Sequence, residues 1–456
     1  MRLVLKLSAA IVGVLATLLC VGFLWLLLAP PALLRVGTGY AAKIVCSNVF
    51  IAGRDAGDVL AEDVQAPGHP LLKLVGIEVD MDQRLVEARL AGLIAPSVAV
   101  YRDGLGCAAV PDGDITKAQG MSAPVSEAVA VDETLVWPRG EKVDATDPRI
   151  VRVLADEALL GPSYRAIVVV KDGRIVGEIY GDGFNAQTPL LGWSMAKTVT
   201  GALTGMVAAE QGTDLETDRL FPEWTDAARS RIRVSDLLAM QSGLDFNEDY
   251  GDVTDVTRML YLEPDMAAYV GSLPVASERG ARFNYSSGES VLISRWCMSR
   301  FSDRETALAF PRTALFQPIG MRSAVLEADA RGTLVGSSYL YATARDWGRF
   351  GLLLAQGGRW DGRPLLPADL ITRMMAGTPA SGGIYGGAQA WRQGPGGAAD
   401  STFGIDAEVL WMLGHDGQSV AVIPAENLVV VRMGLTPSRQ AYRPQRLVAA
   451  VMQALR

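Results

Sequence analysis

The sequence of 456 residues has few of the side chains that bind metals or nucleic acids. It contains two histidines and four cysteines, too few for the repeated Cys/His clusters of structural zinc sites, so we expect no metal. Cations are scarce as well, because 42 lysines and arginines stand against 50 acidic residues. A protein that binds a phosphate backbone needs a cationic face, so we expect no nucleic-acid partner. Hydrophobic residues make up 49% of the chain, which excludes an extended disordered polymer.

Charge is absent altogether from residues 7–34. The apolar core of this run, residues 7–28, is long enough to cross about 30 Å of hydrocarbon as a helix. A cleaved signal peptide is the alternative, but its apolar stretch is usually shorter and ends in small residues at a cleavage site. We therefore favour a single-pass membrane anchor over residues 1–39. Arg2 and Lys6 precede the run, which predicts an inner-membrane protein whose bulk lies on the periplasmic or extracytoplasmic side.

That location bears on the cysteines. An oxidising compartment permits a disulfide between Cys46 and Cys107, which both follow the anchor. The alternative is two unrelated buried thiols. Cys297, in a predicted helix, is most simply a small core residue, and Cys20 a side chain that faces lipid.

Two further units follow the anchor. Residues 40–149 are predicted to form a small β-rich region and a connector, because short apolar runs such as KLVGIEV, RLVEARL and SVAVYRDGLGCAAV alternate with turn signals before a proline-containing polar stretch at 111–147. Residues 150–456 begin with a helix and a hairpin of strands, and end with EVLWMLG, SVAVI, LVVVRMG and a closing helix. Strands from both ends, with helices between them, predict an α/β protein of the α+β type, with one antiparallel sheet flanked by helices and a helical insertion.

A serine and a lysine lie at the start of the helix predicted after the hairpin, in LLGWSMAKTVTGALTGMVAAEQG, which Gly212 would end. The spacing of Ser194 and Lys197 puts both side chains on one face of the first turn. Unpaired backbone N–H groups there favour an alkoxide and an oxyanion. A lysine among apolar neighbours has a lowered pKa and can accept a proton from the serine. Alone the pattern is weak, because the chain has 25 serines and seven lysines, and its other interpretation is a helix start with a solvated lysine.

Two later segments add weight to this pair. Tyr285 lies in ARFNYSSGES, a Gly- and Ser-rich turn before an apolar helix, and a phenol beside an ammonium can accept a proton once its pKa falls. Near the C-terminus, His415, Asp416 and Gly417 end one predicted strand, and Gln418 leads into the next.

With these three segments in this order, the sequence resembles the serine β-lactamase-related hydrolases, which include class C β-lactamases, D-alanyl-D-alanine carboxypeptidases, β-lactamase-fold esterases and 6-aminohexanoate-dimer hydrolase. The motifs that carry the resemblance are S-M-A-K at 194–197, Y-S-S at 285–287 in place of Y-x-N, and H-D-G at 415–417 in place of K-T-G. The resemblance covers roughly residues 150–456 and implies the β-lactamase/transpeptidase-like fold.

The resemblance also implies roles for particular residues. Ser194 would be the acylated nucleophile, Lys197 its proton partner, and Tyr285 the general base that also serves the leaving group. The backbone N–H groups of Ser194 and Gln418 would form the oxyanion hole. No cofactor is needed for this chemistry.

Four residues are implied to bind substrate: Ser287, His415, Gly417 and Gln418. Ser287 stands where the family often has asparagine, and His415 would line the opposite wall of the cleft. The chain has no lysine after Lys197, so it has no K-T-G at the third motif. A mostly neutral imidazole holds a substrate carboxylate less strongly than an ammonium.

We therefore expect poor β-lactam turnover and a small-molecule ester or linear amide as substrate. The alternatives within the enzyme class are a D-Ala-D-Ala carboxypeptidase and a β-lactamase. A non-catalytic envelope protein of the same fold, which binds peptidoglycan or a partner, is the alternative from another class.

Overall fold

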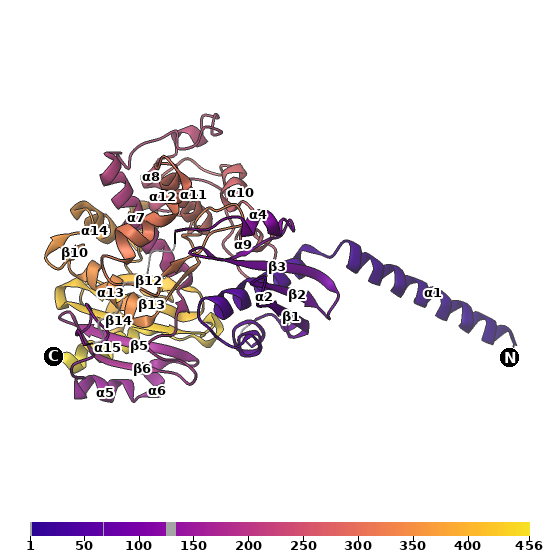
Figure 1. The fold of residues 1–456 in the computed structure, drawn as a ribbon, viewed down its shortest axis with the longest axis horizontal. Coiled ribbons are helices and arrows are strands. Elements are labelled where there is room, and N and C mark those ends of the chain that lie inside the picture. Colours follow the sequence, from indigo (N-terminus) through magenta and orange to yellow (C-terminus); the bar gives the residue numbers. More distant parts are fainter. Residues whose placement is uncertain (1, 67, 125–133) are drawn as a thin grey trace.

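The computed structural model describes residues 2–66, 68–124 and 134–456. Most of these residues form one body, and the first helix projects from it (Figure 1). Residues 125–133, within the predicted connector, lie outside the described residues.

A five-stranded antiparallel sheet forms the base of the C-terminal part, in the order β12-β13-β14-β5-β6. Its strands come from both ends of that part: β5 (Tyr164–Lys171), β6 (Arg174–Tyr180), β12 (Leu410–Gly414), β13 (Gln418–Ile423) and β14 (Leu428–Gly434). β14 pairs with β5, with Val430 opposite Val169. The two ends of the C-terminal part therefore close one sheet, which confirms the predicted antiparallel arrangement.

Helices cover both faces of this sheet (Figure 1): α13 (Ala344–Ala355) lies on one, and α5 (Pro148–Leu154) and α15 (Pro444–Leu455) lie on the other. Successive strand residues point to opposite faces, so Val168 joins the core beneath α13 while Val169 joins the core beneath α5 and α15. Because both faces are buried, β5 and β14 consist mainly of aliphatic residues without an alternating polar face.

A helical subdomain lies between the two halves of the sheet in sequence and beside it in space (Figure 1). Its first helix, α7, begins after Met195 and ends at Gly212, whose left-handed φ of 59° is the predicted stop. Its helices are α7 (Ala196–Gln211), α8 (Val234–Leu238), α9 (Asp255–Leu262), α10 (Met266–Ser272), α11 (Ser287–Met298), α12 (Arg304–Phe310) and α14 (Ala368–Met375). The remaining short elements of this part are α6 (Glu157–Leu160), β7 (Leu190–Leu191), β8 (Val325–Leu326), β9 (Leu340–Ala342), β10 (Arg359–Trp360) and β11 (Arg363–Pro364).

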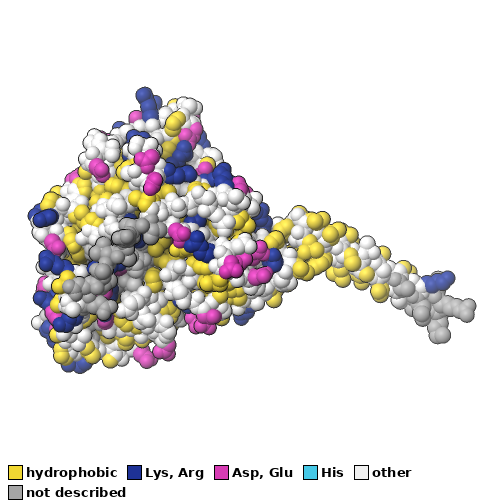
Figure 2. All heavy atoms as spheres, in the orientation of Figure 1, with side chains coloured by type: hydrophobic (Ala, Val, Ile, Leu, Met, Phe, Trp, Pro, Cys, Tyr) yellow, Lys and Arg dark blue, Asp and Glu magenta, His cyan; other side chains and the backbone are white. Residues whose placement is uncertain are grey.

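Helix α1 (Arg2–Leu28) projects from the body and carries mostly apolar side chains (Figure 2). Its segment Lys6–Leu28 is, within the described residues, the one helix long and apolar enough to cross a membrane. None of its most apolar window is buried by the rest of the chain. The helix therefore has the length and composition expected of the anchor, which a signal sequence shares.

The N-terminal region contains a helix that the sequence does not predict. Helix α2 (Ala32–Phe50) crosses the expected boundary at residues 39 and 40, and its second half is buried on nearly every side. A helix buried all round shows no apolar stripe, so its pattern gives no helical signal. It packs on a four-stranded antiparallel sheet of β1 (Val75–Asp80), β2 (Leu85–Leu90), β3 (Ile94–Arg102) and β4 (Gly106–Ala109). Two short helices complete the region, α3 (Ala56–Val59) and α4 (Ile115–Gln119).

The four cysteines fall into one bonded pair and two free thiols. Cys46 of α2 and Cys107 of β4 form a disulfide, with Cα atoms 6.1 Å apart. Cys20 is an exposed free thiol on α1, and Cys297 a partly buried one in α11. The disulfide joins α2 to the far edge of the small sheet.

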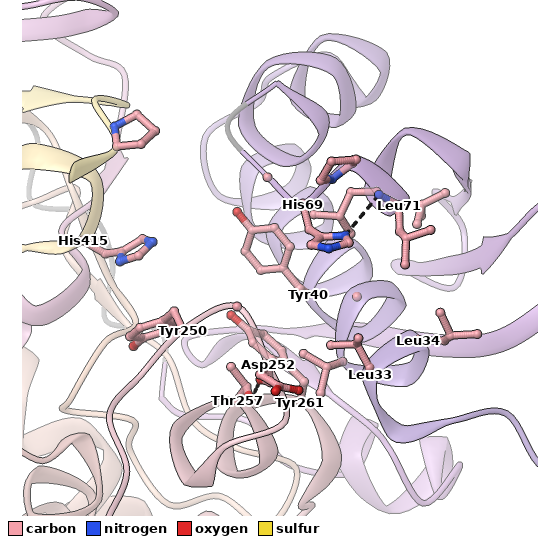
Figure 3. A pocket seen from close by; sticks show the side chains of 18 of the residues that line it. Leu33, Leu34, Tyr40, His69, Leu71, Tyr250, Asp252, Thr257, Tyr261 and His415 are labelled. Atoms are coloured by element: carbon pink, nitrogen blue, oxygen red, sulfur yellow. Dashed lines mark hydrogen bonds between the residues drawn. The ribbon is translucent and has the colours of Figure 1, made fainter. Parts of the chain in front are cut away.

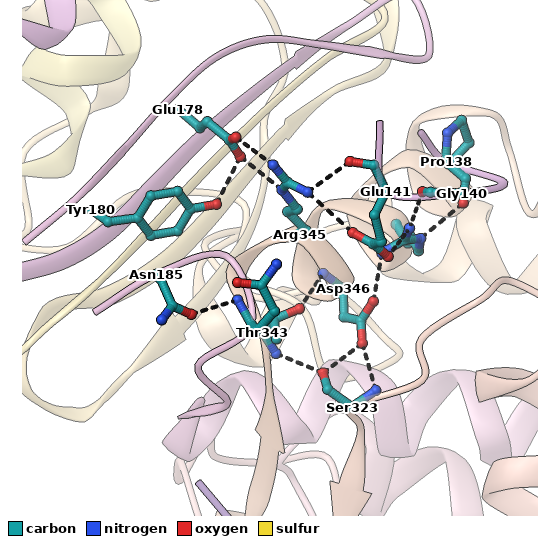
Figure 4. A network of polar contacts seen from close by, with 12 residues as sticks. Pro138, Gly140, Glu141, Glu178, Tyr180, Asn185, Ser323, Thr343, Arg345 and Asp346 are labelled. Atoms are coloured by element: carbon teal, nitrogen blue, oxygen red, sulfur yellow. Dashed lines mark hydrogen bonds and ion pairs between the residues drawn. The ribbon is translucent and has the colours of Figure 1, made fainter. Parts of the chain in front are cut away.

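Charged side chains hold the described end of the connector against the C-terminal part (Figure 4). Arg345 of α13 donates to both carboxylate oxygens of Glu178 in β6. It also donates to the backbone oxygen of Glu141 in the connector, at a distance of 2.8 Å. Arg349, one turn further along α13, donates to the Glu141 carboxylate at 2.7 Å. Both arginines are buried, so these ion pairs fix the connector to α13 and are not solvent-exposed surface pairs.

Candidate active site

Ser194 lies in a tight turn between β7 and α7. The turn, η3 (Trp193–Met195), is a single 3-10 turn, and Trp193 adopts a φ of 49° that costs a non-glycine residue about 1 kcal/mol. Gly192 allows the close packing, because a Cβ there would lie 2.2 Å from the Trp347 ring. Ser194 stays partly exposed while its neighbours Trp193 and Met195 are buried. The turn therefore presents one hydroxyl to the surface from a rigid base.

Lys197 follows one turn later and faces the serine. Its Nζ lies 3.0 Å from Ser194 Oγ, 2.9 Å from Ser287 Oγ and 3.0 Å from the backbone oxygen of Ser337. Only 1% of the side chain is exposed, and burial lowers the pKa of the ammonium to about 8. The predicted fall in pKa is thus present, so a substantial share of Lys197 is neutral near physiological pH and can accept a proton.

Tyr285 stands on the other side of Lys197, whose Nζ lies 4.8 Å from the centre of the phenol ring. Aromatic rings of Tyr385 and Trp391 enclose it, with centroids 5.9 Å and 5.1 Å away. Burial and the Glu248 carboxylate raise the pKa of Tyr285 well above its usual value, although a hydrogen bond with Ser194 opposes the rise. The pKa of the phenol is therefore raised, so the fall in pKa on which proton acceptance by Tyr285 would depend is not found.

Glu248 is a site residue that the sequence does not reveal. It lies in the loop before α9, and its carboxylate accepts hydrogen bonds from the Ser287 backbone N–H at 2.7 Å and from Ser287 Oγ at 2.5 Å. Its Oε1 is 4.0 Å from Lys197 Nζ. This negative charge raises the pKa of Lys197, while burial raises the pKa of Glu248 itself. In DFNEDYGDV nothing distinguishes this glutamate from its acidic neighbours, and only the folding of the loop places it here.

Ser287 connects the two charged groups of the site. It is the first residue of α11, accepts a hydrogen bond from Lys197 and donates one to Glu248. A hydroxyl can do both at once. Its side chain is fully buried, so its place in the structure is between Lys197 and Glu248 and not on the open wall of the cleft.

The third motif forms the turn between β12 and β13. Gly414 lies so close to the turn before Ser194 that a Cβ there would be 2.3 Å from the Gly192 backbone oxygen. Gly417 has a left-handed φ of 83°, which favours glycine. The Gln418 side chain turns into the sheet and accepts a hydrogen bond from the Gly434 N–H at 2.9 Å, which leaves its backbone as the part that borders the serine turn.

His415 lies at the edge of the site and packs against two aromatic residues. Its ring centroid is 5.5 Å from Trp193 and 4.7 Å from Tyr250, and its Nε2 is 3.5 Å from Asp416 Oδ1. About 39% of its side chain is exposed, so solvent or a ligand can reach it. The described residues contain no group of three His, Cys, Asp or Glu side chains that could hold a metal ion.

A family model described as Beta-lactamase matches residues 165–450, more than half of the chain. The chain therefore belongs to the Beta-lactamase family, a family of hydrolases, as the motifs predict. The structural resemblance extends to distant relatives. A protein from Bacillus anthracis described as a 6-aminohexanoate-dimer hydrolase has a TM-score of 0.55 at 21% identity, over 69% of this chain and 85% of its own.

Two further solved structures share the fold at lower identity. A protein from Bacteroides dorei described as a beta-lactamase has a TM-score of 0.53 at 19% identity, over 67% of this chain and 97% of its own. EstCE1, described as a hydrolase with promiscuous acyltransferase activity, has a TM-score of 0.52 at 14% identity, over 67% of this chain and 97% of its own. These similarities confirm the fold class predicted from the sequence.

Proposed function

We propose that this protein is a serine hydrolase that works through an acyl-enzyme on an ester or a linear amide. The observation that carries the proposal is the 3.0 Å contact between Lys197 Nζ and Ser194 Oγ, with a lysine whose pKa is lowered to about 8 by burial. A neutral amine at hydrogen-bond distance from a partly exposed hydroxyl is a base that can activate that hydroxyl as a nucleophile.

In the acylation step, neutral Lys197 accepts the Ser194 proton as Oγ bonds to the carbonyl carbon. The backbone N–H groups of Ser194 and Gln418 stabilise the resulting oxyanion. The ester C–O or amide C–N bond then breaks, and the leaving group takes a proton from the neutral Tyr285 phenol, which Lys197 reprotonates. Water attacks the acyl carbon in the second half, its proton passes to Lys197 and then to Ser194 Oγ, and the carboxylic acid leaves.

The Lys197, Ser287 and Glu248 cluster supports this assignment of roles. Glu248 holds Ser287 through two hydrogen bonds, and Ser287 in turn accepts one from Lys197. The lysine is thereby held toward Ser194 with its remaining protons directed at fixed acceptors. Such preorganisation removes the entropy of orienting the base during reaction.

The substrate proposal rests on the third motif. His415 replaces the lysine of K-T-G, so the cleft lacks the fixed ammonium that would hold the carboxylate of a β-lactam. The fold shared with EstCE1 and with the 6-aminohexanoate-dimer hydrolase-like protein is compatible with esters and linear amides. We propose further that α1 anchors the protein in the inner membrane by a single pass, with the hydrolase part on the periplasmic or extracytoplasmic side.

A labelled fluorophosphonate tests the nucleophile. Wild-type protein should be tagged, and Ser194→Ala should not be. A folded wild-type protein that remains untagged would instead favour the non-catalytic binding protein. Substrate class is tested by comparing p-nitrophenyl acetate and butyrate with nitrocefin and a D-Ala-D-Ala peptide, and rapid nitrocefin hydrolysis would refute the preference for esters and linear amides.

A further inference from the structure

A cavity of about 490 Å³ lies between the N-terminal region, which follows α1 and includes α2 and β1–β4, and residues 150–456, here called the hydrolase part (Figure 3). Its volume falls within the roughly 300–1,000 Å³ typical of small-molecule sites. One wall comes from α2 and the segment that precedes β1, and the opposite wall from the loop before α9, from α9 itself and from the H-D-G turn. The cavity therefore exists only because the N-terminal region docks on the hydrolase part.

One end of the cavity adjoins the serine turn. Trp193, the residue directly before Ser194, lines it together with Tyr250 and His415. The ring of His415 packs against both of the other two. Figure 3 shows His415 and Tyr250 on one side of the cavity, across from Tyr40. Ser194 is not itself a lining residue, so this end of the cavity borders the turn that carries the nucleophile through Trp193.

The other end is formed by the residues that follow α1. Leu33 and Leu34 line it, on the side of the cavity away from His415 (Figure 3). They come five and six residues after Leu28, the last residue of α1. Leu33 and Leu71, also a wall residue, are 37% and 39% exposed. If α1 spans the bilayer, this apolar end of the cavity opens at the membrane surface.

Three polar side chains in the walls are hydrogen-bonded within the protein, while the charged residues Asp252, Asp416 and Arg439 line the end of the cavity near the H-D-G turn and the loop before α9. The Tyr40 hydroxyl donates to the Asp63 backbone oxygen at 3.1 Å, and His69 Nδ1 accepts from the Leu71 N–H at 3.2 Å. Thr257 Oγ1 donates to the Asp252 backbone oxygen at 2.6 Å. These side chains therefore present mainly carbon to the cavity, which suits a hydrocarbon better than a polar ligand.

We infer that the cavity holds the hydrocarbon chain on the acyl side of the substrate, and that the substrate is an amphiphilic ester or amide drawn from the bilayer. This inference rests on the proposed serine hydrolase. Neither Ser194 nor Tyr285 lines the cavity, but Trp193, the neighbour of Ser194, does, and Tyr285 is the proposed proton donor to the leaving group, so we assign the cavity to the acyl side. A hydrocarbon chain that moves from lipid into the cavity gains little free energy, because both surroundings are apolar. Binding of the chain therefore serves mainly to orient the substrate carbonyl at Ser194.

Gly37 offers a test, because it lines the cavity on α2 and a Cβ there would point at the end of the Leu72 side chain, 3.3 Å away. In the full chain in lipid nanodiscs, Gly37→Phe should lower the ratio of kcat/KM for p-nitrophenyl decanoate to that for p-nitrophenyl acetate by about tenfold. Leu34→Trp, at the other end of the cavity, should lower the same ratio. Comparing each ratio with wild type removes differences in how the esters partition into the disc.

Gly76→Phe is the matched control, because Gly76 is exposed on β1 and has no atom near its Cβ position. It should leave the decanoate to acetate ratio unchanged. Tagging of Ser194 by a short-chain fluorophosphonate verifies that each variant is folded. An unchanged ratio in both folded cavity variants would refute the acyl pocket.

A second measurement does not depend on turnover. In Ser194→Ala, a photoactivatable diazirine fatty acid dissolved in the nanodisc should label peptides that contain Tyr250 or Tyr261, and Gly37→Phe should abolish this label. Labelling confined to α1 would overturn the inference. Normal acetate hydrolysis with no effect of the cavity variants refutes the acyl pocket alone, whereas wild-type protein that neither hydrolyses acetate nor accepts the fluorophosphonate refutes the hydrolase on which the inference rests.

Discussion

Lys43 Nζ of α2 lies 2.7 Å from Oε2 of Glu327, a residue in the segment that joins β8 to β9, and both side chains are fully buried. The pair joins the N-terminal region to the hydrolase part across 284 positions of sequence. Glu327 also accepts from Ser47 Oγ at 2.9 Å and from the Cys107 N–H at 2.6 Å, and Lys43 lies 3.8 Å from the centre of the Tyr339 ring. The two parts of the chain therefore share one core and are not two bodies on a loose linker.

Breaking this pair should destabilise the whole protein. Lys43→Met leaves the buried Glu327 carboxylate without its counter-ion, which we expect to cost about 3–5 kcal/mol. Thermal unfolding of the detergent-solubilised full chain measures the loss. Arg84→Met is the control, because Arg84 pairs with Asp103 on the exposed surface and should change stability by less than about 1 kcal/mol. Equal losses in the two variants would contradict the structural role of the buried pair.

The activity should depend on pH through Lys197. In the proposed mechanism its neutral form accepts the proton, and burial lowers its pKa to about 8, so kcat/KM should rise with pH up to about 8 and level off above it. Below that pH, activity should fall about tenfold per unit as the ammonium forms. The pH profile of p-nitrophenyl acetate hydrolysis, corrected for spontaneous hydrolysis, measures this. A rate that does not change between pH 6 and 9 would argue against Lys197 as the base.

Removing the charge of Glu248 should move that pH profile. The carboxylate lies 4.0 Å from Lys197 Nζ and favours the ammonium, so Glu248→Gln should lower the pKa of Lys197 and shift the rising limb to lower pH by about one unit. Glu223→Gln is the control, because Glu223 pairs with Arg295 at the surface. If the rising part of the pH profile does not move in Glu248→Gln, or moves to higher pH, Glu248 does not raise the pKa of Lys197.

Tyr285→Phe should reveal the proton donor. Loss of the neutral phenol should lower kcat for an alkyl ester by about 10²–10³-fold, because the departing alkoxide needs a proton. The loss should be smaller for a p-nitrophenyl ester, whose phenolate leaves without protonation. Parallel kinetics on an ethyl ester and a p-nitrophenyl ester of the same acid measure the difference. Equal losses for both would place the role of Tyr285 outside leaving-group protonation.

The disulfide should stabilise the N-terminal region. Because 61 positions separate Cys46 and Cys107, the chain-entropy model assigns the bridge about 4 kcal/mol, and Cys46→Ser/Cys107→Ser should lower the unfolding temperature accordingly. Thiol titration of the denatured, unreduced protein should give two free thiols, from Cys20 and Cys297. Four free thiols would refute the bridge.

Several elements could be predicted because their signal is local. The hairpin predicted near the start of residues 150–456 is formed by β5 and β6, SVAVI forms β13, and LVVVRMG forms β14. Helix α2 could not be predicted, because burial on nearly every side removes its amphipathic pattern. The burial of Arg345 and Asp346 could not be predicted either, because both side chains are charged and their bonding partners, Glu178 and Ser323, are distant in sequence.

The type of most elements, the apolar N-terminal helix, the family and the spacing of Ser194 and Lys197 could all be predicted, because each depends on residues close together along the chain. Three features of the site come instead from the packing of distant segments: Glu248 faces Lys197, burial raises the pKa of Tyr285, and α2 lines the same cavity as Trp193. The burial of a site residue and the charges around it depend on segments that come together only in the folded chain, so the pKa values of the site cannot be predicted from the spacing of its residues in the sequence.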